Sequence, residues 1–265
     1  MLQVALQPGL PGGRWACLRE PCGHDEVVVA GTDAFAATDF LDRLLVSVTG
    51  TSVGPGRAWE LALCDRDRLL RAVHEQLFGD RIEATAKCTA CGEGLEVSFS
   101  VRELAESQRR QAPTTVEGPD EAGSYRALDG RRFRLPHSND LRCVAGLHAE
   151  DAGRALLERC LVDGDPSGDA AVVEEAMEAV GPVLDVELDA RCPHCEASQQ
   201  VQFDIASFLL CALYRERRWL TSEVHRLATA YGWSLDEILA IPRSLRREYV
   251  ALVEAERVAS RRALS

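Results

Sequence analysis

Two Cys-x-x-Cys motifs constrain the fold of this chain more than any other feature. Cys88 and Cys91 form the first motif, and Cys192 and Cys195 repeat its spacing 104 positions later. Four thiolates at this spacing are typical of a tetrahedral zinc site built from two halves. Closing the long loop between the motifs costs about 4–5 kcal/mol, whereas a structural zinc ion contributes roughly 10–16 kcal/mol in small peptides. We therefore expect one zinc ion per chain, held by all four cysteines.

The residues around the two motifs also repeat. Apolar residues stand at +6, +8, +10 and +13 from the second cysteine of each motif, namely Val97, Phe99, Val101 and Leu104, then Val201, Phe203, Ile205 and Phe208. Such alternation predicts a strand after each motif, and helix-like segments precede both, near residues 69–73 and 172–177. The sequence thus predicts an α+β fold with a split four-cysteine zinc ribbon, in which two β-hairpin knuckles arise from an internal duplication.

Other interpretations of the cysteines stay open. The two pairs could be redox dithiols or local disulfides, or their thiols could be free. A redox pair usually lies at a helix N-terminus, whereas each pair here leads into an alternating strand, which disfavours redox chemistry. His194 could replace a thiol ligand, and Cys64 and Cys160 are alternative ligands. Gly92 can adopt a positive φ after the first motif, whereas Glu196 at the equivalent place weakens the second knuckle slightly.

Composition narrows the class of protein. The chain has 46% hydrophobic residues and a net charge of −12, so we expect a globular protein without nonspecific affinity for nucleic acid or anionic membranes. No apolar run approaches the roughly 18 residues of a membrane span. The first residues lack the basic and apolar regions of a secretory signal. Ten cysteines without such a signal favour a reducing cytoplasm and metal-bound or free thiols over disulfides.

Changes in pattern divide the chain into five segments. The predicted segments are an N-terminal arm with short strands and one helix (1–57), the first helix-knuckle repeat (58–110), a linker, hairpin and helix (111–150), the second helix-knuckle repeat (151–210) and an all-helical C-terminal module (211–265). We expect residues 1–14 to be a loose arm, because they contain Pro8, Pro11 and a Gly-Gly pair. Cys17, Cys22 and His24 lie close together, but three ligands at this spacing match no common metal site, so ordinary buried thiols are the simpler expectation.

Short polar motifs mark the expected turns and helix starts. Residues 15–18 and 26–29 are predicted strands, and Asp129-Gly130 predicts a β-hairpin. The expected helix caps are Asp33, Asp65, Ser138 or Asn139, Asp151, Asp204 and Ser234.

The C-terminal residues predict a protein-binding surface. Its seven candidate residues form a heptad stripe and an aromatic group: Leu220, Val224, Leu227 and Tyr231, then Trp219, Trp233 and Tyr249. Three arginines, Arg243, Arg246 and Arg247, are expected to flank this surface and attract an acidic partner. Alternatively, the stripe packs back on Leu239, Leu245 and Leu252 as a closed helical hairpin.

Nucleic-acid binding and catalysis are the competing classes of function. Residues 227–239 are similar to a helix-turn-helix, but its reading helix would present Asp236 and Glu237 to phosphates, which disfavours DNA binding. None of the six histidines stands in a nucleophile, metalloprotease or deaminase pattern, and no phosphate-binding glycine loop is present. We expect no enzymatic activity and no small-molecule substrate. A zinc-ribbon nucleic-acid-binding or regulatory protein is the second hypothesis.

Three segments resemble one known family. They are FGDRIEATAKCTACG (78–92), FDIASFL (203–209) and EVHRLATAYGWSLDEIL (223–239). They resemble the T-even-type baseplate hub assembly chaperone family of contractile phage tails and phage-tail-like contractile injection systems, over about residues 58–255. The resemblance implies a non-enzymatic cytoplasmic protein that helps to build the baseplate hub or remains in it. Its implied partners are hub, spike or tube proteins of the particle.

Overall fold

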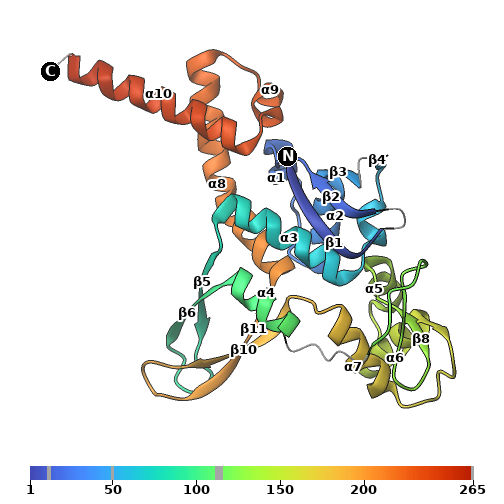
Figure 1. Ribbon diagram of the computed structural model, residues 1–265. Coiled ribbons are helices and arrows are strands. Elements are labelled where there is room, and N and C mark those ends of the chain that lie inside the picture. The colour runs from blue at the N-terminus through green and yellow to red at the C-terminus, as the bar shows by residue number, and fades with distance from the viewer. Residues whose placement is uncertain (11–12, 49–50, 111–115, 264–265) are drawn as a thin grey trace.

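The computed structural model of the protein describes residues 1–10, 13–48, 51–110 and 116–263 (Figure 1). Helices alternate with small antiparallel sheets of four, three, two and two strands, which confirms the expected α+β class. Residues 11–12 of the predicted arm and 111–115 of the predicted linker lie outside the described residues.

The first part of the chain forms a four-stranded sheet and two helices. Their order is β1 (Leu2–Leu10), β2 (Gly13–Leu18), α1 (Gly23–Val27), α2 (Ala34–Leu44), β3 (Leu45–Val48) and β4 (Thr51–Ser52). The expectation of a loose arm is wrong for residues 2–10, because β1 pairs with β2 from Leu2 opposite Leu18. Leu6 is buried on the inner face of this hairpin, so the strand is held by non-local packing that Pro8 does not prevent.

The predicted strand at residues 26–29 is also wrong. Asp25 accepts a hydrogen bond from the Cys22 amide (2.9 Å) and Glu26 is buried against Arg243 and Arg246, so both acidic side chains find partners in a helical turn. The helix at residues 34–44 is as expected, since Asp33 accepts hydrogen bonds from two amides of its first turn.

The main core lies between the four-stranded sheet and three helices. η1 (Arg57–Glu60) leads into α3 (Leu63–Phe78), whose apolar residues pack with α2 and with the first half of α8 (Ile205–Tyr231). Asp65 is not the cap of α3: the N-cap is Ala62, and the buried Asp65 accepts a hydrogen bond from the Gln7 amide of β1 (2.6 Å). Gly79, with φ 88°, ends α3.

Two β-hairpins leave this core and carry the cysteine motifs. The elements are β5 (Arg81–Lys87), β6 (Gly94–Ser100) and α4 (Val101–Arg110), then β10 (Asp185–Arg191) and β11 (Ser198–Asp204), which leads into α8. Every strand end of the second hairpin stands 104 positions after its counterpart, and the registers agree: Ile82 faces Phe99, and Val186 faces Phe203. Figure 1 shows the two hairpins side by side.

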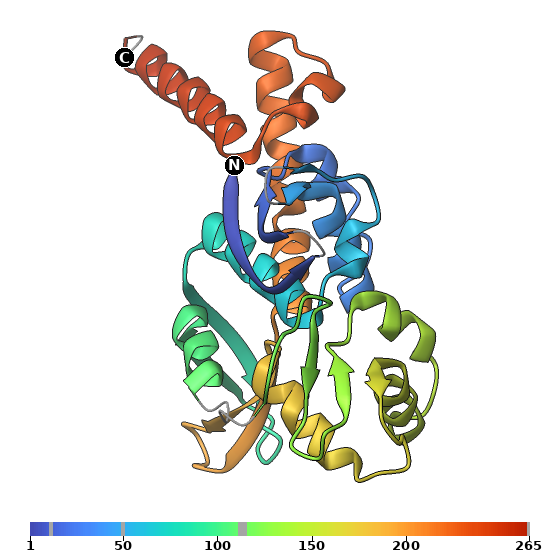
Figure 2. The same ribbon diagram turned by 45° about the vertical axis from the view of Figure 1, so that its right-hand side comes forward.

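The chain between the hairpins forms a second packed unit (Figure 2). Its elements are β7 (Ser124–Arg126), β8 (Arg132–Arg134), α5 (Ser138–Val144), α6 (Ala149–Cys160), β9 (Leu161–Asp163) and α7 (Ala170–Val180). The hairpin at Asp129-Gly130 is confirmed, and Gly130 has φ 87°. The caps of α5 and α6 are His137 and His148, not the residues predicted, because the chain turns into each helix earlier.

Three helices complete the chain. α8 runs without a break from Ile205 to Tyr231, and α9 (Leu235–Ala240) and α10 (Arg243–Ala263) follow. Asp204 and Ser234 cap α8 and α9 as predicted. The first half of α8 is buried in the main core, so the helix crosses residue 211, where the C-terminal segment was expected to begin. Figure 1 shows α10 extending away from the rest of the molecule.

Candidate metal centre

The tips of the two hairpins bring four cysteine sulfurs together. The Sγ atoms of Cys88 and Cys195 are 3.6 Å apart, those of Cys91 and Cys192 are 3.7 Å apart, and all four lie within 4.8 Å of one another. A tetrahedral site with metal–sulfur bonds of about 2.3 Å needs sulfurs about 3.8 Å apart. The observed separations fit such a site, so the four cysteines could bind a metal ion. No other such group of His, Cys, Asp or Glu occurs among the residues that the structure describes.

Each knuckle is closed by the same backbone hydrogen bonds. Gly92 N donates to Cys88 O and Glu196 N donates to Cys192 O, both at 2.9 Å. The residue after each motif is left-handed, with φ 78° at Gly92 and φ 61° at Glu196. Glu196 is the only non-glycine residue with positive φ in the described chain. The second knuckle therefore keeps the geometry of the first, although a side chain stands where glycine is more favourable.

Arg191 supports Glu196 in this conformation. Its Nε donates to the Glu196 carbonyl oxygen (3.2 Å), and its Nη2 donates to the Glu196 carboxylate (2.9 Å). Both side chains are exposed, so the ion pair itself contributes little stability. The bond to the carbonyl oxygen does more, because it holds the backbone of the knuckle.

A glutamine side chain ties one knuckle to the other. Gln199 of β11 accepts a hydrogen bond from the Thr89 amide (2.8 Å) and donates to the Lys87 carbonyl oxygen (3.1 Å). Below the sulfurs, Phe99 and Phe203 meet edge to face with ring centroids 5.0 Å apart. The sequence analysis missed Gln199, because a polar residue on an alternating strand gives no sign of what it contacts.

The protonation of the thiols reflects their crowding. Backbone hydrogen bonds from Cys91 and Ala90 lower the pKa of Cys88 to about 6. The Glu93 backbone favours the Cys91 thiolate, but desolvation and hydrogen bonds with the neighbouring cysteines raise the pKa of Cys91 to about 12. Four thiols this close do not all ionise on their own, so metal binding at this site is expected to release protons.

The alternative ligands lie elsewhere. His194 is exposed and is not part of the sulfur cluster. Cys64 of α3 is buried against the second packed unit, and Cys160 is buried at the end of α6. Desolvation raises the pKa of Cys64 to about 12 and that of Cys160 to about 11. Cys17 and His24 belong to no metal-binding group of the described residues.

The seven predicted partner-binding residues divide into buried and exposed groups. Leu220 and Leu227 are buried, with exposures of 5% and 0%, so the heptad stripe is not a free surface. Instead, Leu227 packs with Ile238, Val250 and Val253 in a small core, against which Val224, Trp233 and Tyr249 lie. Trp219 and Tyr231 remain exposed at 51% and 40%.

Two of the three arginines expected to flank a binding surface are buried. Arg243 and Arg246 are 3% and 0% exposed, and both pair with Glu26 of α1 at 2.6 Å. Arg243 also pairs with Glu216, and Arg246 pairs with Glu223 at 2.7 Å. The prediction is wrong for these two because a buried guanidinium needs carboxylate partners. Their role is to fix the start of α10 against α1 and α8.

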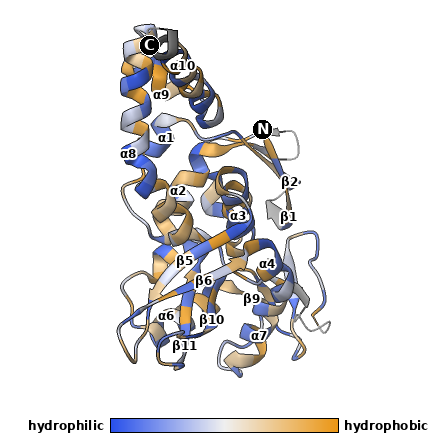
Figure 3. Ribbon diagram, turned by 90° about the vertical axis from the view of Figure 1, so that its left-hand side faces the viewer, coloured by the Kyte–Doolittle hydropathy of each residue, from blue (hydrophilic) through white to orange (hydrophobic). Residues whose placement is uncertain are grey.

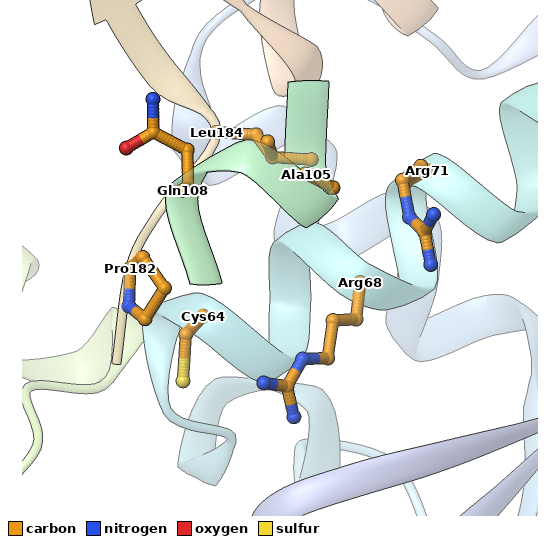
Figure 4. Close-up of a pocket in the computed structure, with 7 residues that line it drawn as sticks. All are labelled: Cys64, Arg68, Arg71, Ala105, Gln108, Pro182 and Leu184. Atoms are coloured by element: carbon orange, nitrogen blue, oxygen red, sulfur yellow. The ribbon is translucent and has the colours of Figure 1, made fainter. Parts of the chain in front are cut away.

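A narrow pocket lies between α3, α4 and the chain before β10 (Figure 4). Its lining residues are Cys64, Arg68, Arg71, Ala105, Gln108, Pro182 and Leu184, and its volume is about 20 Å³. This space suits a single water-sized molecule. The nearby arginines are engaged by the chain itself, since Arg68 pairs with Asp65 and Arg71 pairs with Glu75.

Comparisons with protein-family models, curated proteins and solved structures find no match for the chain. Among the described residues, no helix is both long enough and apolar enough to cross a membrane.

Proposed function

We propose that the four cysteines hold one structural zinc ion per chain and form a split zinc ribbon from a duplicated hairpin. The clustering of Cys88, Cys91, Cys192 and Cys195 within 4.8 Å carries this proposal. Thiolate-only sets select zinc among the common divalent ions. With four protein ligands no coordination position is left for a substrate, so the ion is structural.

The zinc ion stabilises two hairpins that are weak alone. An isolated two-stranded hairpin is marginally stable in water, and the apolar cluster beneath the sulfurs is small, with Leu95 as its one large buried aliphatic residue. The metal joins β5–β6 to β10–β11 and thereby closes the chain around the second packed unit.

We infer that the protein is a non-enzymatic cytoplasmic assembly chaperone or structural component of the baseplate hub of a contractile tail-like particle. The support is the resemblance of residues 78–92, 203–209 and 223–239 to the baseplate hub chaperone family, together with a closed metal site. The function proceeds through contacts with hub, spike or tube proteins.

Co-expression tests this function. The zinc-loaded chain is produced together with hub, spike and tube proteins of a contractile tail-like particle, and complexes are isolated by affinity and size-exclusion chromatography. We expect a soluble complex with at least one of these proteins and no binding to duplex DNA at about 0.15 M salt. If none of them co-purifies and the chain binds DNA tightly with a steep salt dependence, the protein is a nucleic-acid-binding zinc ribbon instead.

A further inference from the structure

The middle of α8 carries an exposed group of basic and aromatic side chains. We call this the basic-aromatic face and define it as Tyr214, Arg215, Arg217, Arg218 and Trp219. Tyr214 and Trp219 are 57% and 51% exposed, which is unusual for such large aromatic residues. Figure 3 shows hydrophilic and hydrophobic residues alternating along this helix.

The three arginines of this face have no acidic partner within the described chain. No carboxylate of the described residues forms an ion pair with Arg215, Arg217 or Arg218. Arg217 instead lies over the Tyr214 ring at 5.7 Å, and Arg218 lies over the Trp219 ring at 5.1 Å. These contacts hold the guanidinium groups of Arg217 and Arg218 over aromatic rings and leave their N–H groups available to a partner.

The neighbouring arginines, in contrast, are paired with carboxylates. Arg243 and Arg246 are neutralised by buried glutamates, Arg247 pairs with Glu216 (2.5 Å), and Arg226 pairs with Glu254. Among the described arginines from Arg215 to Arg247, therefore, only those of the basic-aromatic face lack an ion pair. The whole chain carries −12, so a patch of three free cations is a local exception that favours an acidic partner.

A groove begins at Trp219 and continues between α8 and α10. It measures about 380 Å³ and is lined by Glu216, Trp219, Ser222, Glu223, Arg226, Arg247 and Val250. Trp219 and Val250 are its apolar residues, and Glu216, Glu223, Arg226 and Arg247 are its charged ones. An apolar strip with a charged border is the surface that an amphipathic helix recognises.

We propose that the basic-aromatic face and this groove bind an acidic amphipathic helix of a protein partner. Leucine-like side chains of that helix pack on Trp219 and Val250, and its carboxylates pair with Arg215 and Arg218, because Arg217 stands two positions before Trp219 and points to the other side of α8. Arginine and tryptophan are the residues that contribute most to protein interfaces. The proposal rests on the proposed function only in taking the partner to be a protein. A nucleic acid fits less well, because Glu216 and Glu223 in the groove would repel a continuous row of phosphates, whereas a helix can place its carboxylates beside the arginines alone.

The test uses a fluorescent designed peptide of about 20 residues with leucines at helical spacing and glutamates beside them. Its binding to the zinc-loaded full chain is measured by fluorescence anisotropy at about 0.15 M salt. A peptide with lysine in place of glutamate and a duplex DNA oligonucleotide serve as alternative ligands. We expect only the acidic peptide to bind, with an affinity that falls as salt rises.

Matched variants locate the binding surface. The triple variant R215E/R217E/R218E is expected to weaken binding by at least about tenfold, as is Trp219→Ala. The control R81E/R126E/R154E makes the same change in net charge at exposed arginines away from α8, and Trp15→Ala removes a tryptophan that is 48% exposed on β2. Both controls should change the affinity by less than about twofold, because distant charges are screened.

Three outcomes would overturn the proposal. The acidic peptide does not bind, the lysine peptide or the DNA binds instead, or the two triple variants weaken binding equally. Circular dichroism and metal content of each variant show whether it is folded. Failure of the peptide to bind would not contradict co-purification with particle proteins. Failure of that co-purification would not contradict peptide binding, so the two proposals can be refuted separately.

Discussion

The hairpin of β5 and β6 and the hairpin of β10 and β11 share strand lengths, register and knuckle hydrogen bonds. The offset of 104 positions also exchanges the two short sulfur contacts, since Cys88 with Cys195 becomes Cys192 with Cys91. Phe99 and Phe203 are related in the same way and touch each other. The two hairpins thus face each other with approximate twofold symmetry around the proposed metal.

Away from the sulfurs this symmetry fails. Leu95 is buried beneath the cysteines, whereas its counterpart Gln199 bonds to the backbone of the other knuckle. The outer face of β10 carries Asp185, Glu187, Asp189 and Arg191 and is acidic on balance, whereas that of β5 carries Arg81, Glu83 and Lys87 and is basic on balance. The metal site therefore requires equal geometry only at the tips of the hairpins. The remaining residues of each hairpin are determined by what that hairpin contacts.

The largest expected effect comes from Cys88→Ser and Cys192→Ser, which change symmetry-related ligands. If one ion is shared, either substitution should release the metal completely and lower the free energy of unfolding by about 4 kcal/mol or more. Metal analysis and urea unfolding measure both quantities. Cys143→Ser, at an exposed thiol outside the cluster, should change neither. Half of the metal remaining in each variant would show two independent sites.

Much of this region could be predicted from the sequence, because its information is local. The cysteine spacing, the alternating strands and the Asp204 cap all lie within a few residues of the structure they determine. The left-handed Glu196 could not be predicted from its residue type, since glycine is the usual residue there. It is held by Arg191 and by the closure of the knuckle.

The predictions from the sequence are wrong where a residue contacts partners that are distant in the chain. β1 was expected to be unstructured because its pairing with β2 and packing on α3 do not show in its own residues. The sequence predicts a strand at Glu26, because its partners Arg243 and Arg246 lie more than 200 positions away and do not show in the local pattern. For the same reason these arginines were expected on the surface, and the unpaired arginines of α8 were overlooked. The run Arg217-Arg218-Trp219 was the available signal.

A smaller effect separates the residues that follow the two motifs. Gly92→Ala should lower the free energy of unfolding by about 1 kcal/mol, because a Cβ disfavours the left-handed conformation. No heavy atom lies within 4 Å of that Cβ, so the cost is conformational. Glu196→Gly should raise stability by about 0.5 kcal/mol, less than the reverse change since glycine also gains entropy in the unfolded chain.

Urea unfolding of the zinc-loaded protein measures these differences. Gly94→Ala is the matched control, because Gly94 lies in the same hairpin without a positive φ and its added Cβ would meet only Thr85 Cγ2 at 3.4 Å. We expect it to change stability less than Gly92→Ala. We expect Gly92→Ala to lower the free energy of unfolding and Glu196→Gly to raise it. A loss of stability in both variants would show that the Glu196 side chain stabilises its knuckle.

The smallest effect concerns the residue before each hairpin, which is Asp80 in the first and Leu184 in the second. Hydrogen bonds from the Ser100 hydroxyl (2.6 Å) and the Arg102 amide (3.0 Å) lower the pKa of Asp80 below its usual value. A lowered folded-state pKa means that the carboxylate stabilises the folded protein at pH values above about 4 and loses this contribution as the pH falls further. Leu184 has no carboxylate and makes no such contribution.

Asp80→Asn should therefore be slightly less stable than the wild type at pH 6, by less than the effect of Gly92→Ala, because Asp80 is only half-buried and its charge is screened by solvent. The difference between the two proteins should shrink as the pH falls below about 4, and comparing them at each pH cancels any loss of metal, which affects both equally. Ser100→Ala removes the first hydrogen-bond donor and should reduce the effect of Asp80→Asn at pH 6. A difference that stays constant from pH 6 to pH 3 would mean that the two hairpins begin in electrostatically equivalent ways.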